Sequence, residues 1–379
     1  MHDRSALGPA DVTDAELTAM VAALLDADPG VVEVTDSHAV EFPYDLPAIT
    51  TAGRYWVSGT ARVAGRDQPF RMFVKHIQSW VRHPLFEQVP REAREMAAQS
   101  VPWRTEALAY ASDLRDRLPD GLSMPRALGV FDLDELANAV WLEEVPVVDR
   151  AWDLPRFAHT ARLLGRLAVS ADVEPLRDVG EFGFEVHTYL HGRLAMQVLP
   201  MVRDEGIWHH PLVAGAFDDD LRARLLDAAD RMAAYVDELA ALPRGSSHGD
   251  ACPNNLLSRT DSDDVVLIDY GYWAPNAVGH DLGQLLVGDV QLGKGSADSL
   301  HEIDETIVPA YLEGMRAEGS DIPADVVRRA HAVQLLVFTG ISTLPFEHLD
   351  RAPTPELHED AAQRAKIARF SLDLVDATA

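Results

Sequence analysis

The sequence has one cysteine, Cys252, and no hydrophobic run long enough to cross a bilayer. A single cysteine excludes a framework of intrachain disulfides. The apolar stretch VQLLVFTGIS, residues 333–342, is about half as long as a transmembrane helix and contains Gly and Thr. The N-terminal residues MHDRSALGPADVTDAEL lack the apolar core of a secretory signal. These absences predict a cytoplasmic protein that does not enter a membrane.

Basic residues are scarce as well: 33 Lys and Arg stand against 61 Asp and Glu, a formal net charge of −28. No basic run interrupts this excess, so the field of the protein would repel DNA or RNA, and we expect no nucleic-acid partner. An acidic balance would favour a cationic small molecule, although acidity more often serves only solubility. Both interpretations stay open at this stage.

The composition is otherwise that of a globular protein, with 47% hydrophobic and 25% charged residues over 379 positions. This length suits two or three compact units, or one large domain built as two lobes. The pattern predicts a helical prelude at 1–30, strands with one helix at 31–142, a join at 143–149 and mostly helices at 150–379. Strands and helices in separate blocks are typical of an α+β fold.

The strand-rich block has a regular order of elements. Residues 54–63 and 69–77 are β-branched and aromatic runs joined by the turn-rich AGRDQ, which predicts a hairpin with a five-residue link. Apolar residues at helical spacing follow in PWRTEALAYASDLRDRL, residues 102–118. MPRALGVFDL (124–133) and NAVWLEEV (138–145) then predict two more strands. The expected unit is a small sheet with one important helix.

Two short segments of the second half carry the chemistry. SSHGDACPNNLL places Asp250 on a loop after a long amphipathic helix, with Asn255 five residues later. VVLIDYG places Asp269 at the end of a short buried strand. A compact β-ribbon with Asn255 on one arm and Asp269 on the other would bring both side chains beside Asp250. Such a group of oxygens suits a hard divalent cation together with a general base.

The pattern H-G-D-x-x-x-x-N followed by I-D-Y resembles the aminoglycoside phosphotransferase and choline kinase family, whose members are related to protein kinases. GHDLGQLL adds Asp281 followed by Leu, another feature of that family. The resemblance implies a two-lobed, protein-kinase-like fold with a small antiparallel sheet lobe and a larger helical lobe. It implies Asp250 as the catalytic base, Asn255 and Asp269 as ligands of Mg²⁺, and His248 and Asp281 as supports of the catalytic loop.

The resemblance extends to the strand-rich block. Lys75 in VKHI occupies the position of the kinase lysine that binds the α- and β-phosphates. Its ion-pair partner should be a glutamate on the next helix, and Glu106 in WRTEALAY is the first candidate. Glu92 or Glu95 in REAREMAAQ is the alternative.

Two further nucleotide contacts follow from the same comparison. Glu143 and Val145 in WLEEV lie where a hinge would bind adenine through its main chain. The stretch PAITTAG precedes RYWV where kinases often have a glycine-rich loop, but its one glycine is Gly53. We expect main-chain amides near Gly53 to cover phosphate, and the choice between ATP and GTP stays open.

Other notable residues have simpler interpretations. Cys252 has no Cys-His-Asn arrangement around it, so nucleophilic catalysis is not expected. HTYLH (187–191) has two histidines at helical spacing but lacks the Glu of a zinc motif, and it is better interpreted as part of a substrate pocket. The acidic clusters FDDD (217–220) and FEHLDR (346–351) could bind amines but are typical of solvated loops. The segment 79–102 is predicted to be an insertion, without an assigned role.

The sequence therefore predicts a phosphotransferase with an alcohol group as acceptor. It would use Mg²⁺ and ATP or GTP to phosphorylate an aminoglycoside-like antibiotic, a sugar or an amino alcohol. Protein phosphorylation is the rival activity, disfavoured by HGD in place of HRD and by the missing A-P-E segment. A catalytically silent nucleotide-binding or scaffold protein is the rival of another class. Neither the acceptor nor the oligomeric state is indicated.

Overall fold

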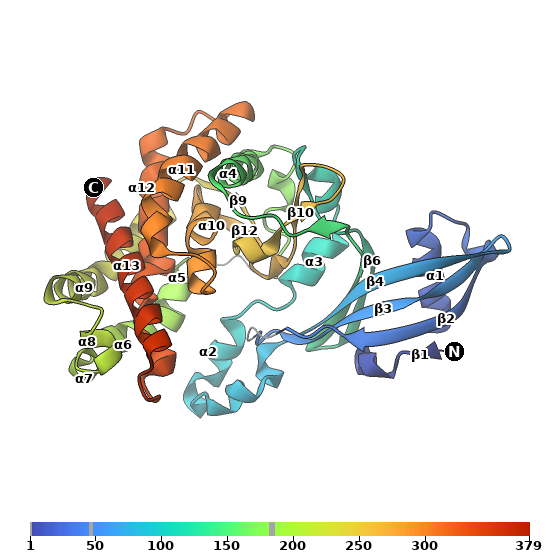
Figure 1. Cartoon of the computed structure of the whole chain (residues 1–379), viewed down its shortest axis with the longest axis horizontal. Helices are drawn as coiled ribbons and strands as arrows, with labels where there is room; N and C mark the ends of the chain where they lie inside the picture. Colours follow the sequence, from blue (N-terminus) through green and yellow to red (C-terminus); the bar gives the residue numbers. More distant parts are fainter. Residues whose placement is uncertain (1, 45–47, 182–185) are drawn as a thin grey trace.

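A β-sheet and a bundle of helices occupy opposite ends of the molecule in the computed structural model (Figure 1). The structure describes residues 2–44, 48–181 and 186–379. The sheet belongs to the N-terminal part of the chain, and most helices belong to the C-terminal part. The predicted two-lobed α+β architecture is confirmed.

The sheet lobe contains six strands in the order β1-β2-β3-β4-β7-β6, of which only the β1–β2 pair is parallel. Its strands are β1 (His2–Asp3), β2 (Val32–Glu41), β3 (Thr51–Val63), β4 (Arg66–Gln78), β6 (Ala127–Asp134) and β7 (Ala137–Glu143). Helix α1 (Asp14–Leu24) packs on one face of this sheet, where Met20 and Val21 meet Met72 and Trp141. Because side chains alternate along β4, Lys75 lies on the other face.

The hairpin between β3 and β4 differs from the prediction. A two-residue turn, Ala64–Gly65, replaces the expected five-residue link, and both of its residues have positive φ. The turn is short because the ladder continues past the apolar runs: Arg62 pairs with Asp67, and the two side chains form an ion pair at 3.0 Å. Positive φ at both positions is the requirement of a type I′ turn.

The helix predicted over 102–118 is also shorter in the structure. Helix α3 spans Thr105–Ala111 and is followed by a 3₁₀ turn, Leu114–Arg117. Ser112 ends it, because its hydroxyl donates to the Ala109 carbonyl and accepts from the Leu114 main-chain N–H. The α-helix is nevertheless long enough to bury one face against the sheet and the helical lobe.

The helical lobe is organised by long amphipathic helices. Its described helices are α4 (Leu154–Val169), α5 (Val186–Tyr189), α6 (Leu199–Arg203), α7 (Glu205–Trp208), α8 (Pro211–Ala214), α9 (Asp219–Ala241), α10 (His280–Gln291), α11 (Leu300–Ala317), α12 (Ala324–Phe338) and α13 (Pro355–Ala377). A π-helical segment, η8 (Leu190–Val198), continues α5. Helices α4, α9, α11 and α12 each bury a stripe of apolar residues at helical spacing. No helix in the described ranges is both long and apolar enough to span a membrane.

Short strands bring the chemistry-bearing loops together at the junction of the lobes. One sheet has the order β5-β11-β10-β8 and consists of β5 (Leu122–Ser123), β8 (Val147–Val148), β10 (Leu256–Arg259) and β11 (Val265–Leu267). A second pair consists of β9 (Arg244–Ser247) and β12 (Ala274–Ala277). The predicted β-ribbon is confirmed, because β10 and β11 are antiparallel with Leu256 opposite Leu267.

Candidate active site

The residues HGDACPNN connect β9 to β10, and the position of this loop depends on a glycine. Gly249 has a φ of +83°, a backbone conformation that residues with a side chain rarely adopt. A Cβ atom there would lie 2.1 Å from the main-chain oxygen of Tyr272. The pairing of β9 with β12 holds the two segments at this close distance. Glycine is therefore the residue that fits between His248 and Asp250.

Asp281 and His248 fasten the same loop. The two carboxylate oxygens of Asp281 accept hydrogen bonds from the main-chain N–H groups of His248 and Gly249, both at 2.9 Å. In the matching tautomer, His248 Nε2 donates to the Ile268 carbonyl at 2.9 Å and Nδ1 accepts from the Asp250 N–H at 3.4 Å. Both ring nitrogens of His248 are thus engaged, which favours a structural role over a role as base.

Asn255 lies against Asp250 at the end of the loop. Its Nδ2 donates to the main-chain oxygen of Asp250 at 2.9 Å and to Oδ2 of the same residue at 3.0 Å. Burial raises the pKa of Asp250 above its ordinary value; His248 opposes the rise, and the Asp269 carboxylate adds to it. A carboxylate with a raised pKa is better matched to proton transfer near neutral pH than an ordinary aspartate.

Lys75 on β4 connects the two lobes. Its Nζ lies 2.5 Å from Oε2 of Glu106 on α3 and 2.9 Å from Oδ1 of Asp269, which follows β11. The side chains of Lys75 and Glu106 are 7% and 6% exposed, whereas that of Asp269 is 37% exposed. Of the three glutamates considered as partners of Lys75, the structure places Glu106 in contact, and not Glu92 or Glu95.

The shared cation affects the two carboxylates differently. Burial raises the pKa of Glu106 to about 7, although attraction to Lys75 opposes the rise. Burial also opposes ionisation of Asp269, but Lys75 together with Arg54 and His248 outweighs it, so the pKa of Asp269 is lowered. Asp269 has a left-handed backbone with φ 64° and ψ 65°, an uncommon conformation that is often found at functional sites. The ionised form is thus favoured at Asp269, which is the more exposed of the two carboxylates.

The side chains of Asn255 and Asp269 fit a hard divalent cation. Lys75 Nζ donates a hydrogen bond to Oδ1 of Asp269. The Asn255 side chain is oriented by the hydrogen bond that its Nδ2 donates to Asp250. Within the described ranges, Oδ2 of Asp269 and Oδ1 of Asn255 accept no hydrogen bond from the protein. Carboxylate and amide oxygens are ligands that Mg²⁺ accepts, with phosphate oxygens and water completing its shell.

Gly53 is not in a loop, contrary to the prediction. It lies inside β3, paired with His76 beside a bulge, because the strand begins at Thr51 rather than at Arg54. The connection that precedes β3 is residues 42–50, and it is only partly described. Its Tyr44 reaches the HGDACPNN loop, where the hydroxyl accepts a hydrogen bond from Asn254 Nδ2 at 3.0 Å.

Glu143 and Val145 lie between the sheet of the first lobe and strand β8 of the second. Glu143 ends β7; its main-chain N–H donates to the Arg126 carbonyl, and its side chain accepts from the Arg126 N–H. The main-chain groups of Val145 make no hydrogen bond with the described part of the chain. They are available to a ligand.

The face of the sheet that carries Lys75 has further residues that sequence reasoning missed. Arg54 is opposite Lys75 in the β3–β4 ladder, and Trp56 is opposite Phe73. The Arg54 guanidinium stacks on the Tyr44 ring at 4.0 Å and lowers the pKa of both Glu106 and Asp269, after the larger effects of burial and Lys75. Strand alternation could have indicated these residues, because positions two apart share a face.

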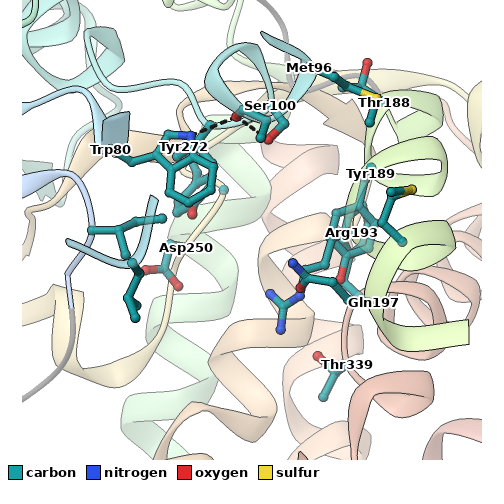
Figure 2. Close-up of a pocket in the computed structure, with 18 of the residues that line it drawn as sticks. Trp80, Met96, Ser100, Thr188, Tyr189, Arg193, Gln197, Asp250, Tyr272 and Thr339 are labelled. Carbon is teal, nitrogen blue, oxygen red and sulfur yellow. Dashed lines mark hydrogen bonds between the residues drawn. The ribbon is translucent and has the colours of Figure 1, made fainter. Parts of the chain in front are cut away.

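A cavity of about 820 Å³ opens beside Asp250 (Figure 2). Segment 79–102 forms one wall, α5 and η8 another, and residues of α10 and α12 also line it. Thr188 and Tyr189 of HTYLH belong to its lining, as the pocket interpretation of that motif predicts. In segment 79–102, the indole of Trp80 and the hydroxyl of Ser100 both donate to the Ala97 carbonyl at 2.8 Å. Segment 79–102 is therefore held together by hydrogen bonds of its own and forms one wall of the cavity.

The described residues support neither a zinc site nor a cysteine nucleophile. Within the described ranges, no three His, Cys, Asp or Glu side chains are grouped as metal ligands. His187 of HTYLH instead contacts Asp237 at 2.9 Å. Burial raises the pKa of Cys252 to about 12, so its thiol stays protonated and is a poor nucleophile.

Comparison of the sequence with models of known protein families identifies the family of this chain. A sequence model of the phosphotransferase enzyme family matches residues 105–318, more than half of the chain. The chain belongs to this phosphotransferase family. The segment shared with the family includes Glu106, Asp250, Asn255 and Asp269, and it begins after Lys75. No curated protein is similar enough in sequence to count as a relative.

Solved structures of phosphotransferases resemble this family member over most of their length. A thermostable mutant of aminoglycoside phosphotransferase APH(4)-Ia, in a ternary complex with ADP and hygromycin B, is 12% identical, with a TM-score of 0.43 and coverage of 91% of this chain and 94% of that one. The amicoumacin kinase hAmiN is 12% identical, with a TM-score of 0.47 and coverage of 92% and 89%. An aminoglycoside phosphotransferase from Alicyclobacillus acidocaldarius is 17% identical, with a TM-score of 0.47 and coverage of 85% and 89%. At these values, inferences about function rest on the chain's own residues.

Proposed function

We propose that the protein transfers the γ-phosphoryl group of ATP to a hydroxyl group of a small molecule. The observation that carries the proposal is the position of Lys75, which contacts a glutamate of its own lobe and Asp269 of the other lobe. Phosphoryl transfer depends mainly on positioning and on charge neutralisation, and this arrangement provides both. GTP remains an alternative donor.

Each side chain has a role in the proposal. Lys75 binds the α- and β-phosphates and is oriented by Glu106. Asp269 and Asn255 hold Mg²⁺, whose charge offsets that of the phosphate oxygens. Asp250 orients the acceptor hydroxyl and takes its proton as the oxygen attacks phosphorus. Its place on the lining of the cavity supports this role, because an acceptor bound there reaches the carboxylate.

The proposal also assigns a role to each segment of the chain. Residues 31–142 would bind the nucleotide and 143–149 would form the hinge, with the free main chain of Val145 taking the base. Residues 150–379 would carry the catalytic loop and the acceptor. The cleft between the lobes is where both substrates meet.

Release of ADP from Mg·ATP across a panel of hydroxyl compounds tests the activity. We expect turnover with at least one acceptor, and we expect Asp250→Ala to lower kcat by about 10²-fold or more, since a positioned general base contributes that much. Thermal shift with Mg·ATP checks that the variant still binds nucleotide. A fully active Asp250→Ala enzyme would remove the base assignment. Nucleotide binding without turnover of any acceptor would favour the silent nucleotide-binding protein.

A further inference from the structure

Several apolar side chains that line the cavity beside Asp250 are exposed to solvent. Leu85, Met96 and Met196 line it and are 48%, 47% and 57% exposed. The first two belong to segment 79–102 and the third to η8, so apolar groups lie on facing walls. Exposed apolar side chains that converge on one cavity mark a binding site for an apolar ligand.

The acidic side chains of segment 79–102 lie outside the cavity. Glu87, Glu92 and Glu95 are its acids, and none of them lines the cavity. Within the described ranges, Asp250 is the one carboxylate of the lining, although the chain has 61 acidic residues. The lining thus has a chemistry different from the acidic surface of the molecule.

Three carboxylates of the acidic clusters considered as amine sites are paired with arginines. Asp218 and Asp220 both pair with Arg369, and Glu347 pairs with Arg364. None of these carboxylates lines the cavity. Against the described lining, a polycation would meet one carboxylate for several ammonium groups, and unpaired buried charges are strongly disfavoured.

Arg193 is the one arginine or lysine of the described lining. Figure 2 shows it on the wall opposite Asp250. It makes no hydrogen bond or ion pair with the described residues, so its five N–H donors are available to a ligand. A guanidinium in a cavity that is also lined by Leu85, Met96 and Met196 suits an oxygen acceptor on an otherwise apolar compound.

We propose that the acceptor is a bulky, largely apolar alcohol with at most one positive charge, and that Arg193 binds one of its oxygen atoms. This inference rests on the proposed kinase function, because it names the substrate class of the same site. Segment 79–102 then has a role: it forms the apolar wall that selects against polycations such as aminoglycosides.

Binding and turnover are measured separately on the full chain. Isothermal titration calorimetry in the presence of Mg·AMP-PNP gives the affinity for macrocyclic lactones, for steroid alcohols with and without a carboxylate, and for hygromycin B as the polycation. ADP release from Mg·ATP with the same compounds gives kcat and KM. We expect an apolar alcohol to bind at least about tenfold more tightly than hygromycin B, because the described part of the lining offers a polycation one carboxylate.

Two pairs of variants locate the selectivity. Arg193→Met should raise the KM of the preferred alcohol about tenfold or more and change kcat little, since it removes a charge-assisted hydrogen bond. Its control is Arg203→Met, an exposed arginine of α6 that pairs with Asp230 outside the cavity. Met96→Glu should weaken apolar alcohols and strengthen hygromycin B, whereas Leu136→Glu, at an exposed apolar position in the β6–β7 turn, should do neither.

The outcomes separate this inference from the proposed function. Apolar alcohols that bind, with no compound of the panel phosphorylated, would keep the cavity as an apolar binding site and contradict the kinase. Apolar alcohols that bind without being phosphorylated, while another compound is phosphorylated, would keep the kinase and overturn the inference. Turnover of hygromycin B in preference to every apolar alcohol would keep the kinase and overturn the inference. An unchanged KM in Arg193→Met would overturn the role of Arg193.

Discussion

At the scale of single residues, the charge at the junction of the lobes depends on one lysine. The Lys75 side chain is 7% exposed, and its ammonium group contacts two carboxylates from different parts of the chain. Without it, Glu106 and Asp269 would face each other with no ordered cation between them. The buried position of Glu106 makes it the residue most sensitive to such a loss, because its pKa is already raised to about 7.

Lys75→Met is predicted to lower the free energy of unfolding by about 3 kcal/mol at pH 8, as expected when one partner of a buried ion pair is removed. The pKa of Glu106 in the folded variant should rise further above its ordinary value of 4.5. The folded state then binds a proton that the unfolded state has lost, so stability falls as pH rises through that range. Urea unfolding at pH 5.5 and pH 8 measures this, with the larger loss expected at pH 8.

Lys366→Met is the matched control, because Lys366 pairs with Asp298 on the surface, where the two side chains are 45% and 71% exposed. It should change stability far less and without dependence on pH. The charge arrangement would be contradicted if both variants lost the same free energy of unfolding. It would also be contradicted if Lys75→Met lost more free energy of unfolding at pH 5.5 than at pH 8.

The sequence identified residues whose spacing belongs to a motif, and it missed residues whose position depends on the fold. His248, Asp250, Asn255 and Asp281 could be named from HGDACPNN and GHDLGQLL alone. The sequence put Glu106 ahead of Glu92 and Glu95 as the partner of Lys75, and the contact in the structure decided among the three. Residues such as Arg54, Tyr44 and Arg193 belong to no motif, and only the arrangement in space brings them to the site.

At the scale of elements, the catalytic loop is positioned by backbone contacts more than by side-chain packing. Gly249 approaches Tyr272 at a distance that excludes any Cβ atom, and Asp281 holds the two adjacent main-chain N–H groups. The loop therefore has little freedom to move while β9 stays paired with β12. Placement of Asp250 follows from this restriction.

Gly249→Ala is predicted to lower kcat by about 10²-fold, since a displacement of roughly 1 Å at a reacting group has that effect. It should also cost roughly 2–4 kcal/mol of unfolding free energy, from the left-handed backbone and the collision with Tyr272. Steady-state ADP release and urea unfolding measure the two effects.

Gly293→Ala is the control, because Gly293 also has a positive φ, +68°, but a Cβ atom there meets nothing within 4 Å. Only the backbone strain, about 1 kcal/mol, should remain, with kcat unchanged. Equal effects of the two substitutions on kcat would show that the contact with Tyr272 does not position the loop.

Element boundaries were predicted less well than element types. The β3–β4 turn was predicted too long, because polar Asp67 continues the ladder through an ion pair that hydrophobicity does not reveal. Gly53 was predicted in a loop, because β3 begins three residues before its aromatic run. Segment 79–102 had no periodic pattern, and its role as a wall is visible only beside α5 and η8.

At the scale of the whole molecule, the two lobes contribute different parts of one site. The sheet lobe supplies Lys75 and Glu106, and the helical lobe supplies Asp250, Asn255 and Asp269. The fold class could be predicted because strands and helices lie in separate blocks of the sequence. The chemistry of the cavity could not, because its lining comes from several separate parts of the chain and does not follow the net charge of −28.

The central claim is that Asp269 and Asn255 hold a magnesium-bound nucleotide beside Asp250, and titration calorimetry with Mg·AMP-PNP tests it most directly. The wild-type protein should bind one equivalent, and Asp269→Asn should weaken binding by about tenfold or more, because the cation loses a carboxylate ligand. Asp263→Asn, at a position 90% exposed in the β10–β11 turn, should bind like the wild type. Binding by Asp269→Asn that is as tight as that of the wild type would contradict the account.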